Sequence, residues 1–184
     1  FQNASENEVR SVLQRHFSSA DYHLLNHVTL RLGTGTTQID HVLVSRYGVF
    51  VIETKHYNGW IFAHASWPTW QQVLYRAKFR FQNPLHQNRL HVGAVKALLD
   101  FVPPEQIHSV VVFTGKAEFK TPIPSGVFDL SGLVAYLRSF RQDVLTPNRL
   151  QFCVGRLETK RLELTARTDL EHVEFVRSRQ RRGR

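Results

Sequence analysis

Cysteine and methionine are almost missing from the sequence, which excludes several kinds of protein. Cys153 is the only cysteine, and there is no methionine. One cysteine cannot form an internal disulfide, and it cannot supply the several thiolates of a structural zinc site. We therefore exclude a disulfide-rich secreted domain and a zinc finger. Cys153 lies on an apolar helical stripe, so we expect it to be a small buried side chain.

Long hydrophobic runs are also lacking. The runs from Val49 to Ile52 and from Val110 to Phe113 have four residues each, whereas a transmembrane helix needs ~20. No secretory leader is visible, so we expect a cytoplasmic protein without membrane contact from this segment. The chain starts at Phe1 and contains no methionine. We therefore expect it to belong to a longer polypeptide, and an upstream anchor in the inner membrane is the alternative for its location.

The remaining composition is globular and basic. The 184 residues are 42% apolar and 21% charged, with a net charge of +9. At ~150 residues per domain, this length predicts one domain, which we assign to residues 1–176. Residues 177–184 carry five arginines and no acid, so we expect a basic tail or a linker stub. Such a tail favours a polyanionic partner, because each neutralised phosphate releases counterions; a solvated terminus is the alternative.

The order of predicted elements indicates an α/β fold. Ser5 and Glu8 have the spacing of a capping box at the start of a helix, and apolar periodicity marks the other elements. Helices are predicted over residues 5–17, from 84 onward, 133–140, 147–157 and 168–177, and strands over 22–32, 38–45, 49–55, 60–64 and 107–113. Residues 68–81 are predicted to be part strand and part loop. This order predicts a mixed central β-sheet flanked by helices.

A predicted hairpin brings three ionisable side chains together. If Ser45 faces Gly48 across the turn, the same register places Asp40 opposite Glu53, with Cβ atoms ~4.5–5.5 Å apart. Two carboxylates at that distance repel unless a cation neutralises them, and Mg²⁺ prefers such oxygen ligands. Lys55 lies two residues after Glu53 and therefore shares the same face.

These three side chains suit the hydrolysis of phosphate esters. A bound Mg²⁺ lowers the pKa of an attacking water and stabilises the negative charge of the transition state, and a lysine can orient that water. A surface cluster of salt bridges is the alternative. The register is also sensitive, because a bulge at Gly48 would place the two acids on opposite faces.

The sequence T-x-I-D-H-V-L-V-S-x-Y-G-V-F-V-I-E-T-K-x-x-x-G-W-I, from Thr37 to Ile61, resembles the nuclease-related domain (NERD) family of the PD-(D/E)XK nuclease superfamily. The resemblance continues through F-Q-N-P-L-x-Q-N at residues 81–88 and more weakly through 108–113, and it spans roughly residues 5–140. It implies a restriction-endonuclease-like core. It also implies a deoxyribonuclease that uses Mg²⁺ or Mn²⁺, with DNA as the partner and RNA as the alternative.

The resemblance implies roles for the residues of the hairpin. Asp40 and Glu53 match the metal-binding acids of the family, and Lys55 matches its catalytic lysine. The backbone carbonyl of Thr54 matches a further metal ligand. His41 follows Asp40 directly and should point to the opposite face, so we expect a packed or surface histidine there.

Two matches lie on the predicted helices. The family has Gly-Glu before a valine on its first helix, and here Ser5 and Glu6 precede Val9, so Glu6 is the matching acid. Ser5 replaces the family's glycine, which affects the expected local backbone. Gln87 matches a polar residue that supports the site, and a surface amide is the alternative.

Aromatic and basic side chains alternate between Trp60 and Phe81. The aromatic residues could stack on nucleotide bases while the basic residues hold the backbone, or they could form core beneath a solvated basic face. The residues expected to contact nucleic acid are His56, Arg76, Lys78, Arg80, Arg177, Arg179, Arg181 and Arg182.

Two functions of other classes remain open. One is a catalytically silent nucleic-acid-binding module. The other is an interaction domain of a larger DNA-processing protein that docks through Trp67 and Trp70. The intact set of Asp40, Glu53 and Lys55 favours the nuclease.

Overall fold

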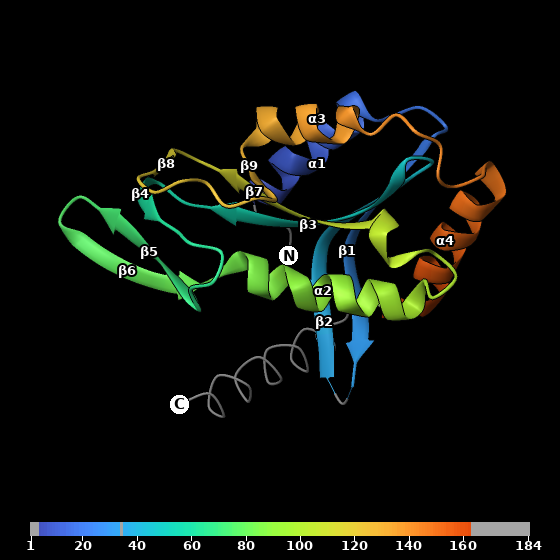
Figure 1. The fold of residues 1–184 in the computed structure, drawn as a ribbon, viewed down its shortest axis with the longest axis horizontal. Helices are drawn as coiled ribbons and strands as arrows, with labels where there is room; N and C mark the ends of the chain where they lie inside the picture. The colour runs from blue at the N-terminus through green and yellow to red at the C-terminus, as the bar shows by residue number, and fades with distance from the viewer. Residues whose placement is uncertain (1–3, 34, 163–184) are drawn as a thin grey trace.

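The structure is a computed structural model, and it describes residues 4–33 and 35–162. The helix predicted over 168–177 and the arginines of the tail lie outside the described residues. The described part contains two β-sheets and four α-helices (Figure 1). Its elements are α1 (Ala4–His16), β1 (Tyr22–Leu32), β2 (Gly35–Ser45), β3 (Gly48–His56), β4 (Gly59–Phe62), β5 (Thr69–Leu74), β6 (Ala77–Gln82), α2 (Pro84–Leu98), the 3₁₀ turn η1 (Pro104–Gln106), β7 (Ile107–Thr114), β8 (Ala117–Phe119), β9 (Val127–Phe128), α3 (Leu130–Ser139) and α4 (Pro147–Lys160).

The larger sheet has five strands in the order β1-β2-β3-β7-β9. β1, β2 and β3 are antiparallel neighbours, β7 runs parallel to β3, and β9 runs parallel to β7. The strand β7 is almost wholly buried, as its continuous apolar run predicts. The α/β class and the mixed central sheet are therefore confirmed, and the architecture is consistent with a restriction-endonuclease-like core.

Helices cover both faces of this sheet. α1 and α3 pack on one face against Leu43, Phe50 and Ile52. α2 and α4 pack on the other face, where the core contains Val42, Val44, Val49 and Val51. Figure 1 shows α1 and α3 together on one side of the strands and α2 on the other. Successive side chains of a strand alternate between faces, so even-numbered residues of β2 and odd-numbered residues of β3 face α2.

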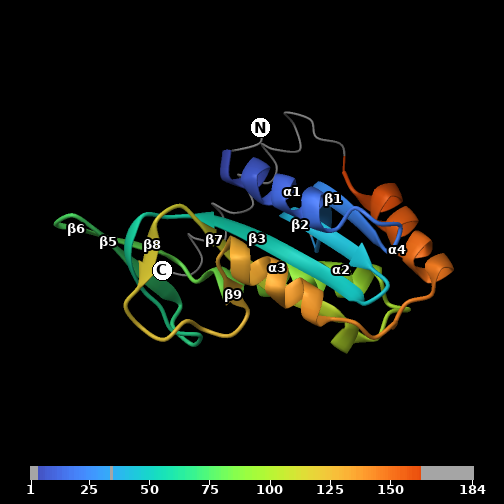
Figure 2. The same cartoon turned by 90° about the horizontal axis from the view of Figure 1, so that it is seen from above.

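A second sheet of four strands, in the order β6-β5-β4-β8, was not predicted as a separate sheet. The sequence indicates β4 and part of the β5–β6 hairpin but gives no sign of β8. Figure 2 shows this sheet at one end of the molecule and α4 at the other. Buried Ile61 and Trp70 pack against Phe113 of β7 and join the second sheet to the first.

Side chains at the helix starts explain where two helices begin. Asn83 accepts a hydrogen bond from the Leu85 N–H before α2, and Thr146 accepts one from the Arg149 N–H before α4. Both helices have proline at the first position, as predicted. α1 begins at Ala4, so Ser5 lies inside the first turn, and the predicted capping position is wrong by one or two residues. Within the described ranges no helix is long and apolar enough to cross a bilayer.

Candidate functional site

The predicted hairpin register is confirmed. Ser45 pairs with Gly48, and the ladder continues to His41 opposite Ile52. The paired positions end there, and Asp40 and Glu53 are the residues that come next on the two strands. The Ser45 hydroxyl donates a hydrogen bond to the Gly48 carbonyl over 2.9 Å and closes the turn without a bulge. Asp40 and Glu53 therefore share the face of the sheet that α2 covers.

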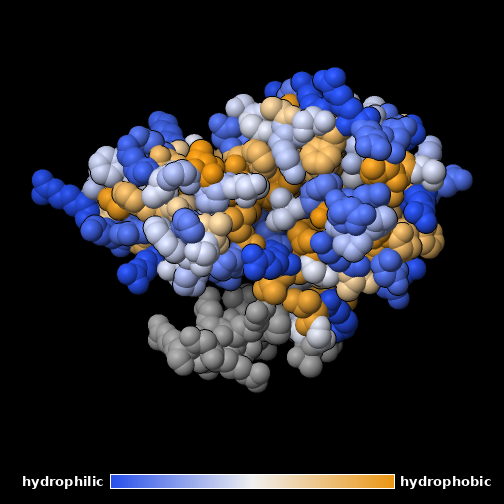
Figure 3. All heavy atoms as spheres, viewed as in Figure 1, coloured by the Kyte–Doolittle hydropathy of each residue, from blue (hydrophilic) through white to orange (hydrophobic). Residues whose placement is uncertain are grey.

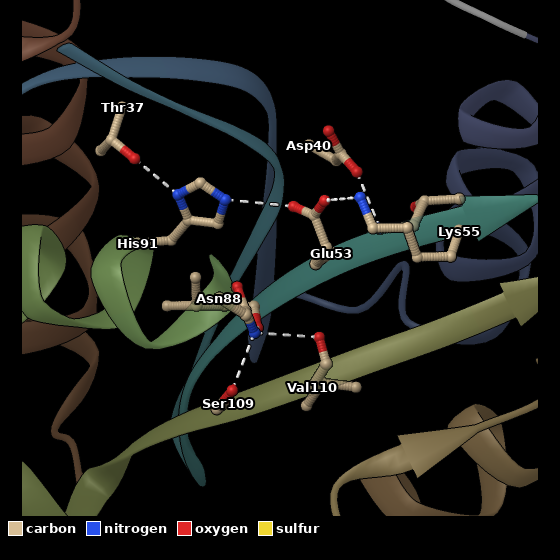
Figure 4. Close-up of polar contacts among 10 residues, drawn as sticks. Thr37, Asp40, Glu53, Lys55, Asn88, His91, Ser109 and Val110 are labelled. Atoms are coloured by element: carbon tan, nitrogen blue, oxygen red, sulfur yellow. Dashed lines mark hydrogen bonds and ion pairs between the residues drawn. The ribbon is translucent and has the colours of Figure 1, made fainter. Parts of the chain in front are cut away.

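Glu53 is buried and contacted by a cationic or polar group at each oxygen. The Lys55 ammonium donates to Glu53 Oε1 over 2.5 Å. Glu53 Oε2 lies 3.1 Å from Nε2 of His91 on α2. Only 4% of the Glu53 side chain and 20% of the Lys55 side chain are exposed. Figure 4 shows these side chains directed toward one another, with Asp40 beside the Lys55 ammonium.

Asp40 is half-buried at the same place. Its Oδ2 accepts a hydrogen bond from the Thr54 backbone N–H over 2.7 Å. Burial and the repulsion of Glu53 raise the pKa of Asp40 well above its usual value, although the Thr54 N–H opposes this shift. Asp40 is therefore the acid of the site that takes up a proton most readily, and a cation between the two carboxylates would reverse that shift.

The other two charges of the site stabilise each other. Burial alone would raise the pKa of Glu53, but the polar contact with His91 and the charge of Lys55 outweigh burial, so that this pKa is lowered. Burial would lower the pKa of Lys55, but Glu53 outweighs it and the pKa is raised. The pair is therefore an ammonium and a carboxylate at neutral pH.

His91 is a site residue that sequence reasoning missed. Its Nδ1 lies 2.6 Å from the Thr37 hydroxyl. Its Nε2 faces Glu53 Oε2 at 3.1 Å, but the two atoms are not aligned as a hydrogen bond. His91 lies four residues after Gln87 on α2, and residues at that spacing share a helix face. The spacing of four residues from Gln87 is the sequence feature that could have indicated His91.

The structure places Gln87 near the site but gives it no direct part. Gln87 is half-buried on α2, where its backbone N–H donates to the Asn83 carbonyl over 3.1 Å, but its side chain has no hydrogen bond within the described part of the chain. The next residue, Asn88, donates to the carbonyls of Val51 and Val110 and to the Ser109 hydroxyl, over 2.8–3.1 Å. Asn88 thereby ties α2 to β3 and β7 and fixes the height of His91 above the sheet.

Glu6 lies on α1, and its charge acts on Asp40. Its Oε2 lies 3.6 Å from Nδ1 of His27, and its negative charge adds to the rise in the pKa of Asp40. His41 points away, as predicted, and its Nδ1 donates to the Asn26 side-chain carbonyl over 2.7 Å. Burial lowers the pKa of His41 to about 3, so this packed histidine stays neutral.

Four of the predicted nucleic-acid contacts lie in the described residues, one at the end of β3 and three on the β5–β6 hairpin of the second sheet. His56 is exposed at the end of β3, with Nδ1 3.0 Å from the Thr114 hydroxyl. The bases Arg76, Lys78 and Arg80 are exposed on the β5–β6 hairpin. Trp70 is fully buried, so the prediction that it docks a partner is wrong. It packs against Phe113 and Phe119, which the sequence does not place near it.

The exposed aromatic residues correct the interpretation that all of these rings are core. Trp60, Trp67, Tyr75 and Phe79 each keep two-fifths or more of their surface exposed. Phe81 is partly buried and stacks on Tyr57, with ring centroids 4.2 Å apart. The segment therefore divides into core and surface.

The acids suit a divalent cation by chemistry, although they do not form a complete cage. Within residues 4–33 and 35–162, no group of three or more His, Cys, Asp or Glu side chains has the geometry of a metal site. Asp40 and Glu53 nevertheless offer hard oxygen ligands from neighbouring strands, and Asp40 shows the repulsion that such a cation relieves. Asp40, Glu53 and the Thr54 carbonyl would hold it.

Comparisons with known proteins agree with this geometry. The chain is 41% identical over 98 residues to an uncharacterized protein of Bacillus anthracis, and the match covers 53% of this chain and 46% of that protein. A family model described as "Nuclease-related domain" matches residues 2–114. The match ends with β7, earlier than the expected limit near residue 140. Because it contains the whole hairpin and α2 and covers well over half of the sequence, the chain belongs to the nuclease-related domain (NERD) family.

Proposed function

We propose that this protein is a metal-dependent nuclease that hydrolyses DNA phosphodiester bonds with Mg²⁺ or Mn²⁺. The observation that carries the proposal is the meeting of Asp40, Glu53 and Lys55 on one face of the hairpin, where burial and the repulsion of Glu53 raise the pKa of Asp40. Membership of the NERD family supports it. When bound, the cation would activate the attacking water and stabilise the charge of the transition state.

The residues of the chain take separate tasks in this proposal. Asp40 and Glu53 bind the cation, and Asp40 must be ionised to do so. His91 lies against the Glu53 carboxylate, with Nε2 3.1 Å from Oε2, and limits its orientation. The Lys55 ammonium screens the phosphoryl oxygens and orients the water. Because Lys55 now contacts Glu53 Oε1, this contact must loosen for Lys55 to reach a phosphate.

The test compares cleavage of supercoiled and linear DNA by the parent chain and by two variants, with Mg²⁺, Mn²⁺ or a chelator. We expect Lys55→Ala and Asp40→Asn to lose cleavage by two orders of magnitude or more, on the order of what removal of a transition-state contact costs. DNA binding by these variants should persist. Lys116→Ala, at an exposed lysine, should cleave like the parent. Undiminished cleavage by Lys55→Ala would remove that lysine from the mechanism.

One observation favours a catalytically silent nucleic-acid-binding module as a second candidate. Both oxygens of Glu53 are already engaged by groups of the protein. Such a module would bind DNA equally with chelator and with Mg²⁺, and it would form no products on long incubation. Metal-dependent products that vanish with Asp40→Asn would exclude it.

A further inference from the structure

The four-stranded sheet has one face packed on the core and one face turned to solvent. Ile61 and Trp70 are fully buried against Phe113, so their side chains define the inner face. Neighbouring residues of a strand alternate, so Trp60 and Phe62 of β4 point outward. The sequence suggests that the aromatic and basic residues of 76–81 act together, but the strand pairing separates them.

The pairing register determines which side chains share the outer face. Trp60 pairs with Val73, and Val73 pairs with Lys78. In the next row, Phe62 pairs with Gln71, and Gln71 pairs with Arg80. We call these six residues the outer face. Two aromatic rings lie on the inner strand β4, and two cations lie on the edge strand β6, with one strand, β5, between them.

The outer face is accessible and positively charged. Trp60 is 49% exposed, and Lys78 and Arg80 are exposed on β6. The Lys120 ammonium lies 4.8 Å from the centre of the Trp60 ring. Glu118 of β8, which pairs with Trp60, is an acid beside this face, and its charge is matched by an ion pair with Lys120.

The sequence around this sheet is depleted in acids. No aspartate or glutamate occurs from Thr54 to Leu99, while six lysines and arginines do. This stretch contains the three strands β4, β5 and β6. Figure 3 shows hydrophilic and hydrophobic residues interspersed over the end of the molecule that carries the β5–β6 hairpin. A surface with interspersed cations and aromatic rings and no unpaired acid suits a nucleic acid strand. The cations can hold its phosphates, and the aromatic rings can stack on its bases.

A hollow continues the outer face toward the start of β5. It has a volume of about 250 Å³, and its lining includes Trp67, Gln71 and Arg80. Trp67 is 43% exposed. The hollow therefore offers a second exposed indole beside a cation, as the outer face does at Trp60.

We propose that the outer face and this hollow bind single-stranded nucleic acid, with bases stacked on Trp60 and Trp67 and phosphates held by Lys78 and Arg80. A sheet that presents aromatic rings can stack only bases whose faces are free, which a paired duplex does not offer. The inference deepens the proposed nuclease function, because Trp60 follows Lys55 by five residues. Five residues span at most ~18 Å, so a strand held on the outer face lies within a few nucleotides of the site.

The test uses the Lys55→Ala chain, so that cleavage does not interfere, and short oligothymidylate and oligouridylate strands. Trp60, Trp67 and Trp70 are the only tryptophans, so stacking on the two exposed ones should quench the intrinsic fluorescence. We expect Trp60→Ala and Trp67→Ala each to weaken binding between about fivefold and a hundredfold. Lys78→Ala with Arg80→Ala should make binding less dependent on salt, by about one unit of slope.

Matched controls lie on α4, at the opposite end of the molecule in Figures 1 and 2. Phe152 is an exposed ring and Arg149 an exposed cation there, and Phe152→Ala and Arg149→Ala should bind the strands like the parent. Far-ultraviolet circular dichroism and the melting temperature establish that each variant is folded. Because Trp60 and Trp67 are half-exposed, we expect both variants to fold.

The outcomes separate this inference from the proposed nuclease. Equal binding by folded Trp60→Ala, Trp67→Ala and parent chains would overturn the inference, as would tighter binding of a duplex of the same length with no fluorescence quench. Metal-dependent cleavage could persist in either case. Tryptophan-dependent binding of single strands by a chain that never cleaves would support the inference and overturn the nuclease. Comparison of the two oligonucleotides distinguishes DNA from RNA as the source of the strand.

Discussion

Glu53 is the residue on which the geometry of the site depends. It is buried on the α2 side of the sheet, between the Lys55 ammonium and the His91 imidazole. A carboxylate buried in this way would protonate without these partners, because burial disfavours its charge. Its lowered pKa therefore depends on both partners. The sequence predicts Lys55 from strand alternation, whereas His91 arrives from a helix 38 residues later in the chain.

His91→Ala tests whether that imidazole positions Glu53. Loss of the imidazole beside Oε2 removes a polar group that favours the charged carboxylate, so the pKa of Glu53 should rise. The acid limb of the kcat/KM profile should therefore move to higher pH, which pH-rate measurements with Mg²⁺ detect. His91→Gln, which can still donate, should restore part of the shift. If folded His91→Ala keeps the kcat/KM profile of the parent, the imidazole only packs against Glu53 and does not tune its charge. His23→Ala, at an exposed histidine on β1, is the control.

His41 makes the stability of the protein sensitive to acid. Its pKa in the folded state is about 3, whereas an unfolded histidine has a pKa of about 6.5. Below pH 6.5 the unfolded chain takes up a proton that the folded chain refuses. The free energy of unfolding therefore falls as pH drops from about 6.5 toward 3, by up to ~1.4 kcal/mol per pH unit from this residue.

Urea unfolding between pH 7 and pH 4 measures this contribution. His41→Leu should be less stable at pH 7, because the Asn26 side chain loses its partner, but its stability should fall less steeply with acid. His23→Ala should keep the slope of the parent. A slope for His41→Leu as steep as that of the parent would contradict a neutral buried His41.

At the scale of elements, the β2–β3 hairpin and the β4–β5–β6 sheet follow from different causes. The tight turn at Ser45 and Gly48 sets the register of β2 against β3, and that register alone brings Asp40 beside Glu53. The second sheet depends on the backbone conformation of the turn between β3 and β4. Gly59 has a φ of +82°, and a Cβ there would lie 2.5 Å from the Val73 carbonyl oxygen. β4 can approach β5 this closely only because residue 59 is glycine.

Gly59→Ala should therefore destabilise the second sheet. The left-handed backbone alone costs an L-residue about 1–2 kcal/mol, and the contact with Val73 adds to that cost. Gly93→Ala is the matched control, because it lies inside α2 with no atom within 4 Å of the added Cβ. We expect it to be neutral or stabilising by about 0.5–1 kcal/mol. Urea unfolding followed by tryptophan fluorescence measures both changes. Equal stability of Gly59→Ala and the parent would contradict the close approach of β4 and β5.

At the scale of the whole molecule, positive charge and its placement determine the expected binding. The net charge of +9 is concentrated partly in the tail of residues 177–184 and partly in the acid-free stretch that forms the second sheet. Cations that neutralise phosphates release counterions, so binding that depends on them weakens as salt rises. The contribution of the tail to binding can be measured separately, because these residues come after the described ones in the sequence and can be removed.

Removal of residues 177–184 from the Lys55→Ala chain tests the contribution of the tail. If all five arginines contact phosphates, the slope of log K against log salt for duplex DNA should become shallower by up to about 4.5. Fluorescence anisotropy at several salt concentrations gives both slopes. The melting temperature should not change, since the removed residues follow the assigned domain. Identical slopes would assign the tail no part in DNA binding.

The sequence by itself determined the α/β class, the strand register and the meeting of Asp40, Glu53 and Lys55, because these depend on alternation and on one short turn. Local patterns also predicted the starts of α2 and α4, since the capping residue and the proline are neighbours of the helix they begin. Only the tertiary structure decided that Trp70 is buried while Trp60 and Trp67 are exposed, and that His91 contacts Glu53. These features depend on contacts between segments that are distant in the chain. An alternating pattern shows that two faces exist, but only packing against β7 and α2 decides which face is covered.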